Sequence, residues 1–186
     1  MRKIPTVYLR DEIDRSKVTD VVNPECQWVL DGEGTPTRKY DGTCVMLDDD
    51  DRWWARREVK PGKTAPAGFV AVSTDEVTGK TVGWEPIEQS SVAKFHAEAV
   101  RARAGQERWA TGTYELCGPK IGNKREKTIE NKAPGHFLQE HFMADRANSG
   151  LAPKDLVRLM AERGWEGIVW HHMDGRMAKL KTRDLL

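Results

Sequence analysis

The stretch TRKYDGTCVML, residues 37–47, contains the tetrapeptide Lys39-Tyr40-Asp41-Gly42. Glycine and proline residues punctuate the segment before it, and the β-type run TCVML follows directly. This pattern predicts that Lys39 lies on a loop or at the end of a strand, not in a helix. A lysine is a nucleophile only when neutral, and its ordinary pKa of about 10.4 leaves on the order of 0.1% neutral at pH 7.4. A buried site with cationic neighbours would raise that fraction.

Length and composition set the bounds on the rest of the chain. The 186 residues fit one domain, or one domain with a small lobe, and can bury roughly 70% of the unfolded surface. The net charge is +1, so affinity for nucleic acid would have to come from local patches. The chain has no apolar run of membrane-spanning length and no signal-peptide core, so we expect no membrane partner. Its three cysteines have no metal-ligand spacing, and their odd number suggests reduced thiols in a cytoplasm.

Alternation and turn signals predict a chain built mostly from strands. We expect a strand to begin at Trp28–Leu30. We also expect a β-hairpin in which TCVML and RWWARREV are the two strands and a run of aspartates is the turn between them. Helices are expected from Ser90 or Ser91 to about Ala104 and from Pro153 to Arg163. Further strands are expected at 7–9, 69–72, 112–118, 136–142, 165–172 and 177–181, with Asp174-Gly175 as the last hairpin turn. This order of elements is typical of an α+β fold rich in antiparallel pairs.

Several charged residues lie on or beside these predicted strands. Glu115 stands between Tyr114 and Leu116, so it points away from the face that those two bury. Lys179 and Lys181 alternate with a leucine and therefore share the opposite face of their strand. A loop after Glu115 is the densest basic patch in the chain and could contact phosphate or be a solvated loop; it carries Lys120, Lys124, Arg125 and Lys127. A position on a solvent-exposed strand edge would explain each of these charged residues taken alone. It would not explain why they occur together as an ordered set along the chain.

The ordered set resembles the motifs of the covalent nucleotidyltransferases, which comprise ATP-dependent RNA and DNA ligases and messenger-RNA capping enzymes. In that superfamily the lysine of a Lys-x-Asp-Gly motif takes up a nucleotide, and Lys39 matches it here. The glutamate that contacts the ribose is matched by Glu115 in YELCG, and the aromatic strand near the base by Phe137 in HFLQEHF. The Glu-Gly motif that supports metal binding is matched by Glu166 in EGIV. The final lysine pair, which holds the α-phosphate, is matched by Lys179 and Lys181 in KLK.

Within the superfamily the chain is most similar to small RNA ligases with KxDGT followed by cysteine. DNA ligases usually carry arginine at the place of Cys44, and Arg56 or Arg57 on the next strand could supply that missing cation. The resemblance implies an antiparallel-rich nucleotidyltransferase fold of the ATP-grasp-like ligase adenylation type. It would span residues 1–186 as one domain without the OB-fold that many relatives carry. The candidate nucleotide-binding residues are Arg38, Asp41, Gly42, Arg57, Glu115, Phe137, Glu166, Lys179 and Lys181.

The resemblance implies a three-step reaction with ATP as the nucleotide. Lys39 attacks the α-phosphorus and expels pyrophosphate, AMP passes to the 5′-phosphate of an RNA end, and a 3′-hydroxyl displaces AMP. Lys179 and Lys181 would stabilise the negative charge on the phosphate oxygens. By like-charge repulsion they would also help to keep Lys39 neutral. Glu166 and Glu115 would bind Mg²⁺ or Mn²⁺, both of which accept oxygen ligands. A DNA ligase, a capping guanylyltransferase and a non-catalytic nucleotide- or RNA-binding module are the alternatives; the RNA joined and the oligomeric state stay open.

The family's OB-fold normally orients the pyrophosphate that leaves in the first step. Only five residues follow Lys181, so we expect cations within the chain to take over that task. The candidates are the basic loop, with Lys120, Lys124, Arg125 and Lys127, and the strand pair Arg56 and Arg57.

Overall fold

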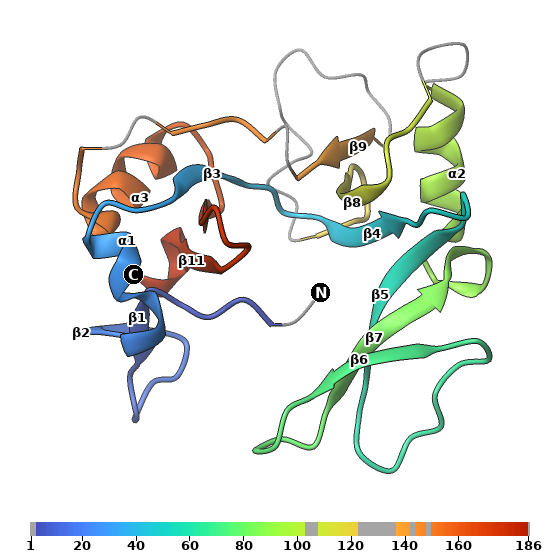
Figure 1. The fold of residues 1–186 in the computed structure, drawn as a ribbon, viewed down its shortest axis with the longest axis horizontal. Helices are drawn as coiled ribbons and strands as arrows, with labels where there is room; N and C mark the ends of the chain where they lie inside the picture. The colour runs from blue at the N-terminus through green and yellow to red at the C-terminus, as the bar shows by residue number, and fades with distance from the viewer. Residues whose placement is uncertain (1–2, 103–107, 123–136, 142–143, 148–149, 186) are drawn as a thin grey trace. The chain divides into compact units, whose positions relative to one another are not determined.

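The computed structural model describes residues 3–102, 108–122, 137–141, 144–147 and 150–185 (Figure 1). Their contacts divide the chain into two compact units. Unit 1 covers residues 41–143, and unit 2 covers residues 3–40 and 144–186, so the boundary falls inside the Lys-Tyr-Asp-Gly motif. The fold is of the α+β class, with mostly antiparallel sheets and few helices, as the sequence predicts.

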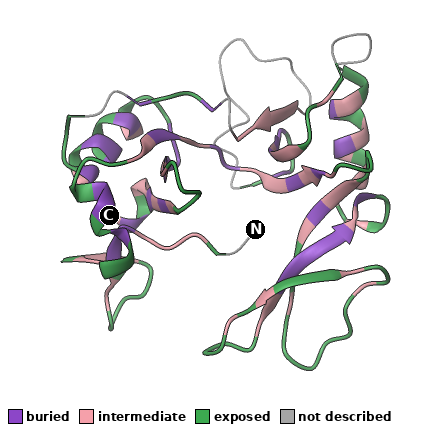
Figure 2. Ribbon diagram, in the orientation of Figure 1, coloured by how far each residue is buried: buried purple, intermediate pink, exposed green. Residues whose placement is uncertain are grey.

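Unit 1 is built on one six-stranded antiparallel sheet with strand order β6-β7-β5-β4-β8-β9. Its strands are β4 (Thr43–Leu47), β5 (Trp53–Val59), β6 (Val70–Thr74), β7 (Thr81–Pro86), β8 (Gly112–Cys117) and β9 (Phe137–Glu140). The 3-10 helix η2 (Ile87–Gln89) and the helix α2 (Ala93–Ala102) follow β7. The predicted hairpin is confirmed as β4–β5, and the edge strand β6 is largely exposed (Figure 2).

The core of unit 1 lies on one face of this sheet. Side chains that alternate along the strands supply it, among them Val45, Ala55, Tyr114 and Leu116. Ala99 of α2 adds to the same cluster. Because successive strand residues point to opposite faces, the residues between these leave a second, more polar face.

Unit 2 combines a three-stranded antiparallel sheet of order β11-β10-β3 with a two-stranded sheet β1-β2. Its elements are β1 (Tyr8–Arg10), β2 (Val18–Val22), η1 (Pro24–Cys26), α1 (Gln27–Leu30), β3 (Thr35–Lys39), α3 (Pro153–Glu162), β10 (Gly167–His171), β11 (Met177–Lys181) and η4 (Thr182–Asp184). Leu156, Val157 and Met160 of α3 pack against Ile168 and Leu180 of the sheet. The predicted helix and the final hairpin are thus confirmed (Figure 1).

The strand predicted at Trp28–Leu30 is wrong. These residues belong to the short helix α1, which continues from the 3-10 turn at Pro24. The Asn23 side chain accepts a hydrogen bond from Glu25 N at 3.1 Å and so starts that turn. A three-residue apolar run has no period of its own, and its flanking cap decides its conformation. None of the helices in the described part of the chain is long and apolar enough to cross a membrane.

Candidate functional site

Lys39 is the last residue of β3, at one end of the three-stranded sheet of unit 2. Gly167 of the central strand β10 lies opposite Lys39 on one side and opposite Lys181 of β11 on the other. Residues directly opposite one another in antiparallel strands share a face, so the two lysines lie on the same face in one row. The glycine between them contributes no side chain to that row.

Glu166 immediately precedes β10 and reaches both lysines. Its Oε2 atom lies 2.6 Å from Lys39 Nζ and its Oε1 atom 2.6 Å from Lys181 Nζ. The residue is only 5% exposed. Burial alone would raise the pKa of Glu166, but the two ammonium groups outweigh it and the pKa is lowered.

Gly167 makes this arrangement possible, because strand β11 lies too close for any side chain. A Cβ atom on Gly167 would lie 2.3 Å from the carbonyl oxygen of Leu180 and 2.7 Å from Lys181 Cα. Both neighbours are backbone atoms that cannot move aside without shifting the strand. The Glu-Gly pair therefore reflects a glycine required by packing and a carboxylate placed between two lysines.

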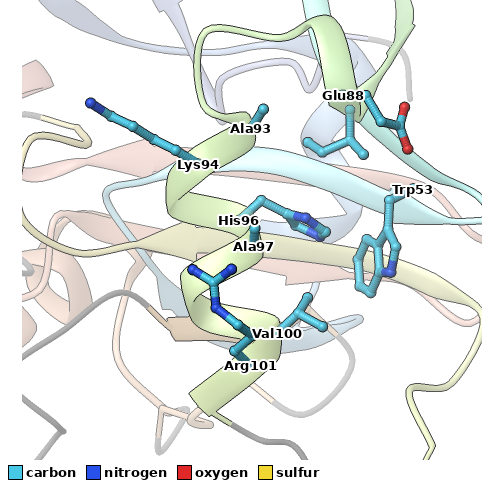
Figure 3. A pocket seen from close by; sticks show the side chains of 9 residues that line it. Trp53, Glu88, Ala93, Lys94, His96, Ala97, Val100 and Arg101 are labelled. Carbon is cyan, nitrogen blue, oxygen red and sulfur yellow. The ribbon is translucent and has the colours of Figure 1, made fainter.

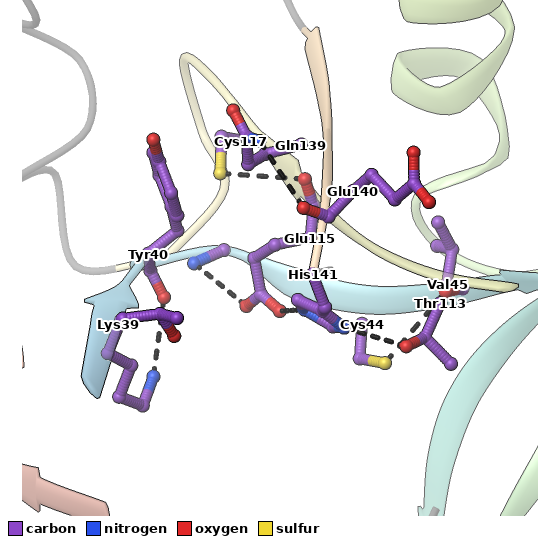
Figure 4. A network of polar contacts seen from close by, with 12 residues as sticks. Lys39, Tyr40, Cys44, Val45, Thr113, Glu115, Cys117, Gln139, Glu140 and His141 are labelled. Atoms are coloured by element: carbon purple, nitrogen blue, oxygen red, sulfur yellow. Dashed lines mark hydrogen bonds and ion pairs between the residues drawn. The ribbon is translucent and has the colours of Figure 1, made fainter. Parts of the chain in front are cut away.

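The sequence predicts that Lys179 and Lys181 repel the Lys39 amine. In the structure the Glu166 carboxylate lies between Lys39 and Lys181, 2.6 Å from each amine, so a negative charge accompanies the two positive ones. Lys39 Nζ also donates to the Tyr40 carbonyl oxygen at 3.3 Å (Figure 4). Lys179 lies on the same face one row further along, opposite Val169.

Arg38 lies on the other side of β3 and contacts Tyr40 and Asp145. Its guanidinium carbon lies 4.5 Å from the centre of the Tyr40 ring, and Nη1 lies 3.5 Å from Asp145 Oδ2. The Tyr40 hydroxyl donates to the same carboxylate oxygen at 2.8 Å. These contacts hold the residues that flank Lys39 in the chain, and neither Tyr40 nor Asp145 was expected from the sequence.

Gly42, the last residue of the motif, contacts β8 in unit 1. Its backbone N–H donates to Glu115 Oε1 at 3.1 Å. A Cβ atom at Gly42 would lie 2.4 Å from the Leu116 carbonyl oxygen, so the close approach requires glycine. Asp41 is buried, and Gly122 approaches its carbonyl oxygen in the same way.

Glu115 belongs to the polar face of the unit 1 sheet, as its alternation predicts. Tyr114 and Leu116 are buried on the other face. Glu115 pairs with Cys44 on β4, and its Oε2 atom lies 3.0 Å from His141 Nε2 (Figure 4). Phe137 is two residues from Gln139, which pairs with Glu115, so alternation puts Phe137 on the face of Glu115. Sequence reasoning missed His141, because only the pairing of β8 with β9 brings it here.

Arg56 and Arg57 point to opposite faces of this sheet. Ala55 pairs with Val45, so its successor Arg56 shares the face of Cys44. Arg57 lies on the core side, where Nη1 is 3.9 Å from Glu85 Oε1. Of the two candidates for the missing cation, Arg56 is therefore the one on the face of Glu115. Lys120 adopts a left-handed conformation with φ of 69°, and Lys124, Arg125 and Lys127 lie outside the described residues.

A pocket of about 550 Å³ lies beside α2 in unit 1, lined by Trp53, His96, Val100 and Arg101 among others (Figure 3). The His96 ring meets Trp53 edge-on, with ring centres 4.5 Å apart. Burial lowers the pKa of His96 to about 4, so the ring is neutral near pH 7. His96 thus has the character of a core residue.

The motif residues form one group in each unit. Unit 2 brings together Lys39, Glu166 and Lys181, and unit 1 brings together Gly42 and Glu115. No protein-family model matches this chain, and no curated protein sequence matches it. The chemistry of these two groups is what bears on function.

Proposed function

We propose that the protein is an ATP-dependent RNA ligase that joins 5′-phosphate and 3′-hydroxyl ends through a lysyl-AMP intermediate on Lys39. The observation that supports this most is the convergence of Lys39, Glu166 and Lys181. These residues are up to 142 positions apart in the sequence, yet one carboxylate contacts both amines at 2.6 Å. The function would make the fold a nucleotidyltransferase domain. The three cysteines are not joined in disulfides, which suits a reducing cytoplasm.

Each residue has a distinct part in this chemistry. Glu166 orients the Lys39 amine. The ammonium gives a proton to solvent, its lone pair then forms a bond to the α-phosphorus, and the bond from that phosphorus to pyrophosphate breaks. Lys181, and Lys179 one row away, supply positive charge for the phosphate oxygens. Glu115, held by the Gly42 N–H, is a carboxylate acceptor of the kind that binds ribose hydroxyls. AMP then passes from Lys39 to the 5′-phosphate of the RNA, and the 3′-hydroxyl displaces it.

The chain also has oxygen donors of the kind that Mg²⁺ or Mn²⁺ prefers. Glu166 is the donor nearest to Lys39, and its two oxygens contact the lysines in this structure. A single carboxylate, completed by phosphate oxygens and water, is a usual environment for Mg²⁺ at nucleotides. When bound, the ion would neutralise negative charge on the phosphates. Glu115 is the second carboxylate proposed for this task.

Labelling with ATP that carries a tag in its α-phosphate tests the proposal. The wild-type protein is expected to become covalently labelled, and the Lys39→Ala and Lys39→Arg variants are not, because a guanidinium is no nucleophile near neutral pH. Lys60→Arg changes an exposed lysine in the same way and is the control that keeps the label. Label that persists in Lys39→Ala would contradict the assignment. Labelling by GTP but not by ATP would favour a guanylyltransferase. The absence of any covalent label would favour a non-catalytic binding module.

Sealing of matched RNA and DNA ends tests the substrate class. We expect faster sealing of RNA, because the KxDGTC likeness points to RNA ligases and Cys44 stands where DNA ligases carry arginine. The 2′-hydroxyl is the group on the sugar that distinguishes the two. Equal rates for all-RNA and all-DNA ends at the same salt concentration would favour the DNA-ligase alternative.

A further inference from the structure

Three side chains of unit 1 bring different metal-ligating atoms to one place on the polar face of its sheet. They are Cys44 of β4, Glu115 of β8 and His141, which directly follows β9. One ligand atom from each residue, a sulfur, a carboxylate oxygen and a ring nitrogen, lies within 4.8 Å of the other two. The sheet register places these atoms, since Cys44 and Glu115 are direct cross-strand partners.

We propose that Cys44, Glu115 and His141 form a binding site for a Zn²⁺-type divalent cation. Thiolate, imidazole and carboxylate are the ligands that Zn²⁺ takes, whereas Mg²⁺ and Ca²⁺ take oxygen alone. Bond lengths of about 2.0–2.3 Å put tetrahedral ligand atoms about 3.5 Å apart, so small side-chain rotations close the site. Three protein ligands leave a fourth position open to water or another small ligand. All three residues are partly exposed, so a cation can reach them from solvent.

Thr113 provides the support that a histidine ligand needs. Its Oγ1 atom lies 2.9 Å from His141 Nδ1, the ring nitrogen that faces away from Glu115. A metal-bound histidine usually donates its other N–H to a fixed acceptor, which sets the tautomer. A hydroxyl can donate or accept a hydrogen bond. Thr113 can therefore keep its contact with Nδ1 when Nδ1 carries the proton and Nε2 is the atom that binds the cation. The Cys44 thiol gives its proton to solvent when its sulfur binds.

The site shares Glu115 with the ligase proposal, but its test measures metal binding and not activity, so the two can fail separately. Chelator-treated protein is titrated with Co²⁺, a spectroscopic substitute for Zn²⁺. We expect one equivalent to bind, with the visible bands of a tetrahedral site and a thiolate-to-cobalt charge-transfer band, both removed when Zn²⁺ displaces Co²⁺. The Cys44→Ser variant is expected to lose the charge-transfer band. Cys26→Ala removes a buried thiol of unit 2 and should leave the spectrum unchanged.

Two further variants keep the test decisive if Cys44→Ser fails to fold. His141→Gln retains the thiol and is expected to lose the tetrahedral visible bands. Thr113→Val retains all three ligands and should weaken Co²⁺ binding about 10–100-fold, the usual effect of removing such a supporting contact. The proposal is overturned if wild-type protein gives no charge-transfer band, if that band survives in Cys44→Ser, or if it disappears in Cys26→Ala. Affinity that is unchanged in Thr113→Val would overturn the assignment of His141 as a ligand.

Discussion

Replacing Glu166 with glutamine is expected to destabilise unit 2 through its two lysines. The substitution keeps the shape of the side chain but removes the charge that lies 2.6 Å from Lys39 Nζ and from Lys181 Nζ. Removing one member of a buried ion pair typically costs about 3–5 kcal/mol. The lysine side chains are 20% and 15% exposed and can turn partly to water, so we expect a loss of about 2–3 kcal/mol.

Urea unfolding followed by far-ultraviolet circular dichroism measures this loss, which corresponds to a midpoint about 1 M lower. The sharper test is the effect of Lys181→Met in two backgrounds. In the wild type it removes a partner of Glu166 and should destabilise. In Glu166→Gln it removes one of two neighbouring like charges and should restore part of the lost stability. A Lys181→Met effect of the same sign and size in both backgrounds would refute the reasoning.

Acid provides an independent check on the same carboxylate. The pKa of Glu166 is lowered in the folded state, so its contribution is present above the unfolded value of about 4.5 and is lost as pH falls through the lower folded value. The difference in unfolding free energy between wild type and Glu166→Gln should therefore be full at pH 7 and should shrink below about pH 4.5. A difference that stays constant down to pH 2.5 would mean that shape or packing, not charge, causes the loss.

Three further predictions concern other parts of the structure. Gly167→Ala should destabilise by about 1–3 kcal/mol in urea unfolding, because its Cβ atom would lie 2.3 Å from the Leu180 carbonyl oxygen; an unchanged midpoint would contradict the close approach. If Arg56 serves the leaving pyrophosphate, Arg56→Gln should slow self-adenylylation but spare sealing of RNA that already carries a 5′-adenylate, whereas Arg57→Gln on the core side should leave both rates unchanged. The pKa of His96 falls from 6.5 to about 4 on folding, so on the order of 3 kcal/mol should be lost between pH 6.5 and 4 in the wild type and not in His96→Phe.

The sequence predicted those elements whose signals are local. The β4–β5 hairpin follows from two alternating runs around an acidic turn, and α3 follows from Pro153 at its start and Gly164 after its end. The orientation of Glu115 followed from its buried neighbours in the same strand. The prediction of a strand at Trp28–Leu30 was wrong because three apolar residues are too few to show a period. The turn at Asn23 and Pro24 directs them into a helix.

The candidate site could be predicted only as far as alternation within one strand reaches. Alternation shows that Lys179 and Lys181 share a face, but it cannot show that Lys181 lies in the same row as Lys39. That row depends on the pairing of β10 with both β3 and β11, and the pairing with β3 joins residues more than a hundred positions apart. The position of Glu166 between two ammonium groups therefore appears only with the fold.

Register also decides between residues that look equivalent in the sequence. Arg56 and Arg57 are adjacent and alike, and both could supply a cation near Cys44. The pairing of Val45 with Ala55 puts Arg56 on the face of Cys44, and a shift of one residue would exchange the two arginines. The same pairing rule brings Cys44 beside Glu115, where we propose a cation site that no spacing of cysteines in the sequence indicated. A comparison of Arg56→Gln with Arg57→Gln is thus a functional test of strand register as well as of the cation.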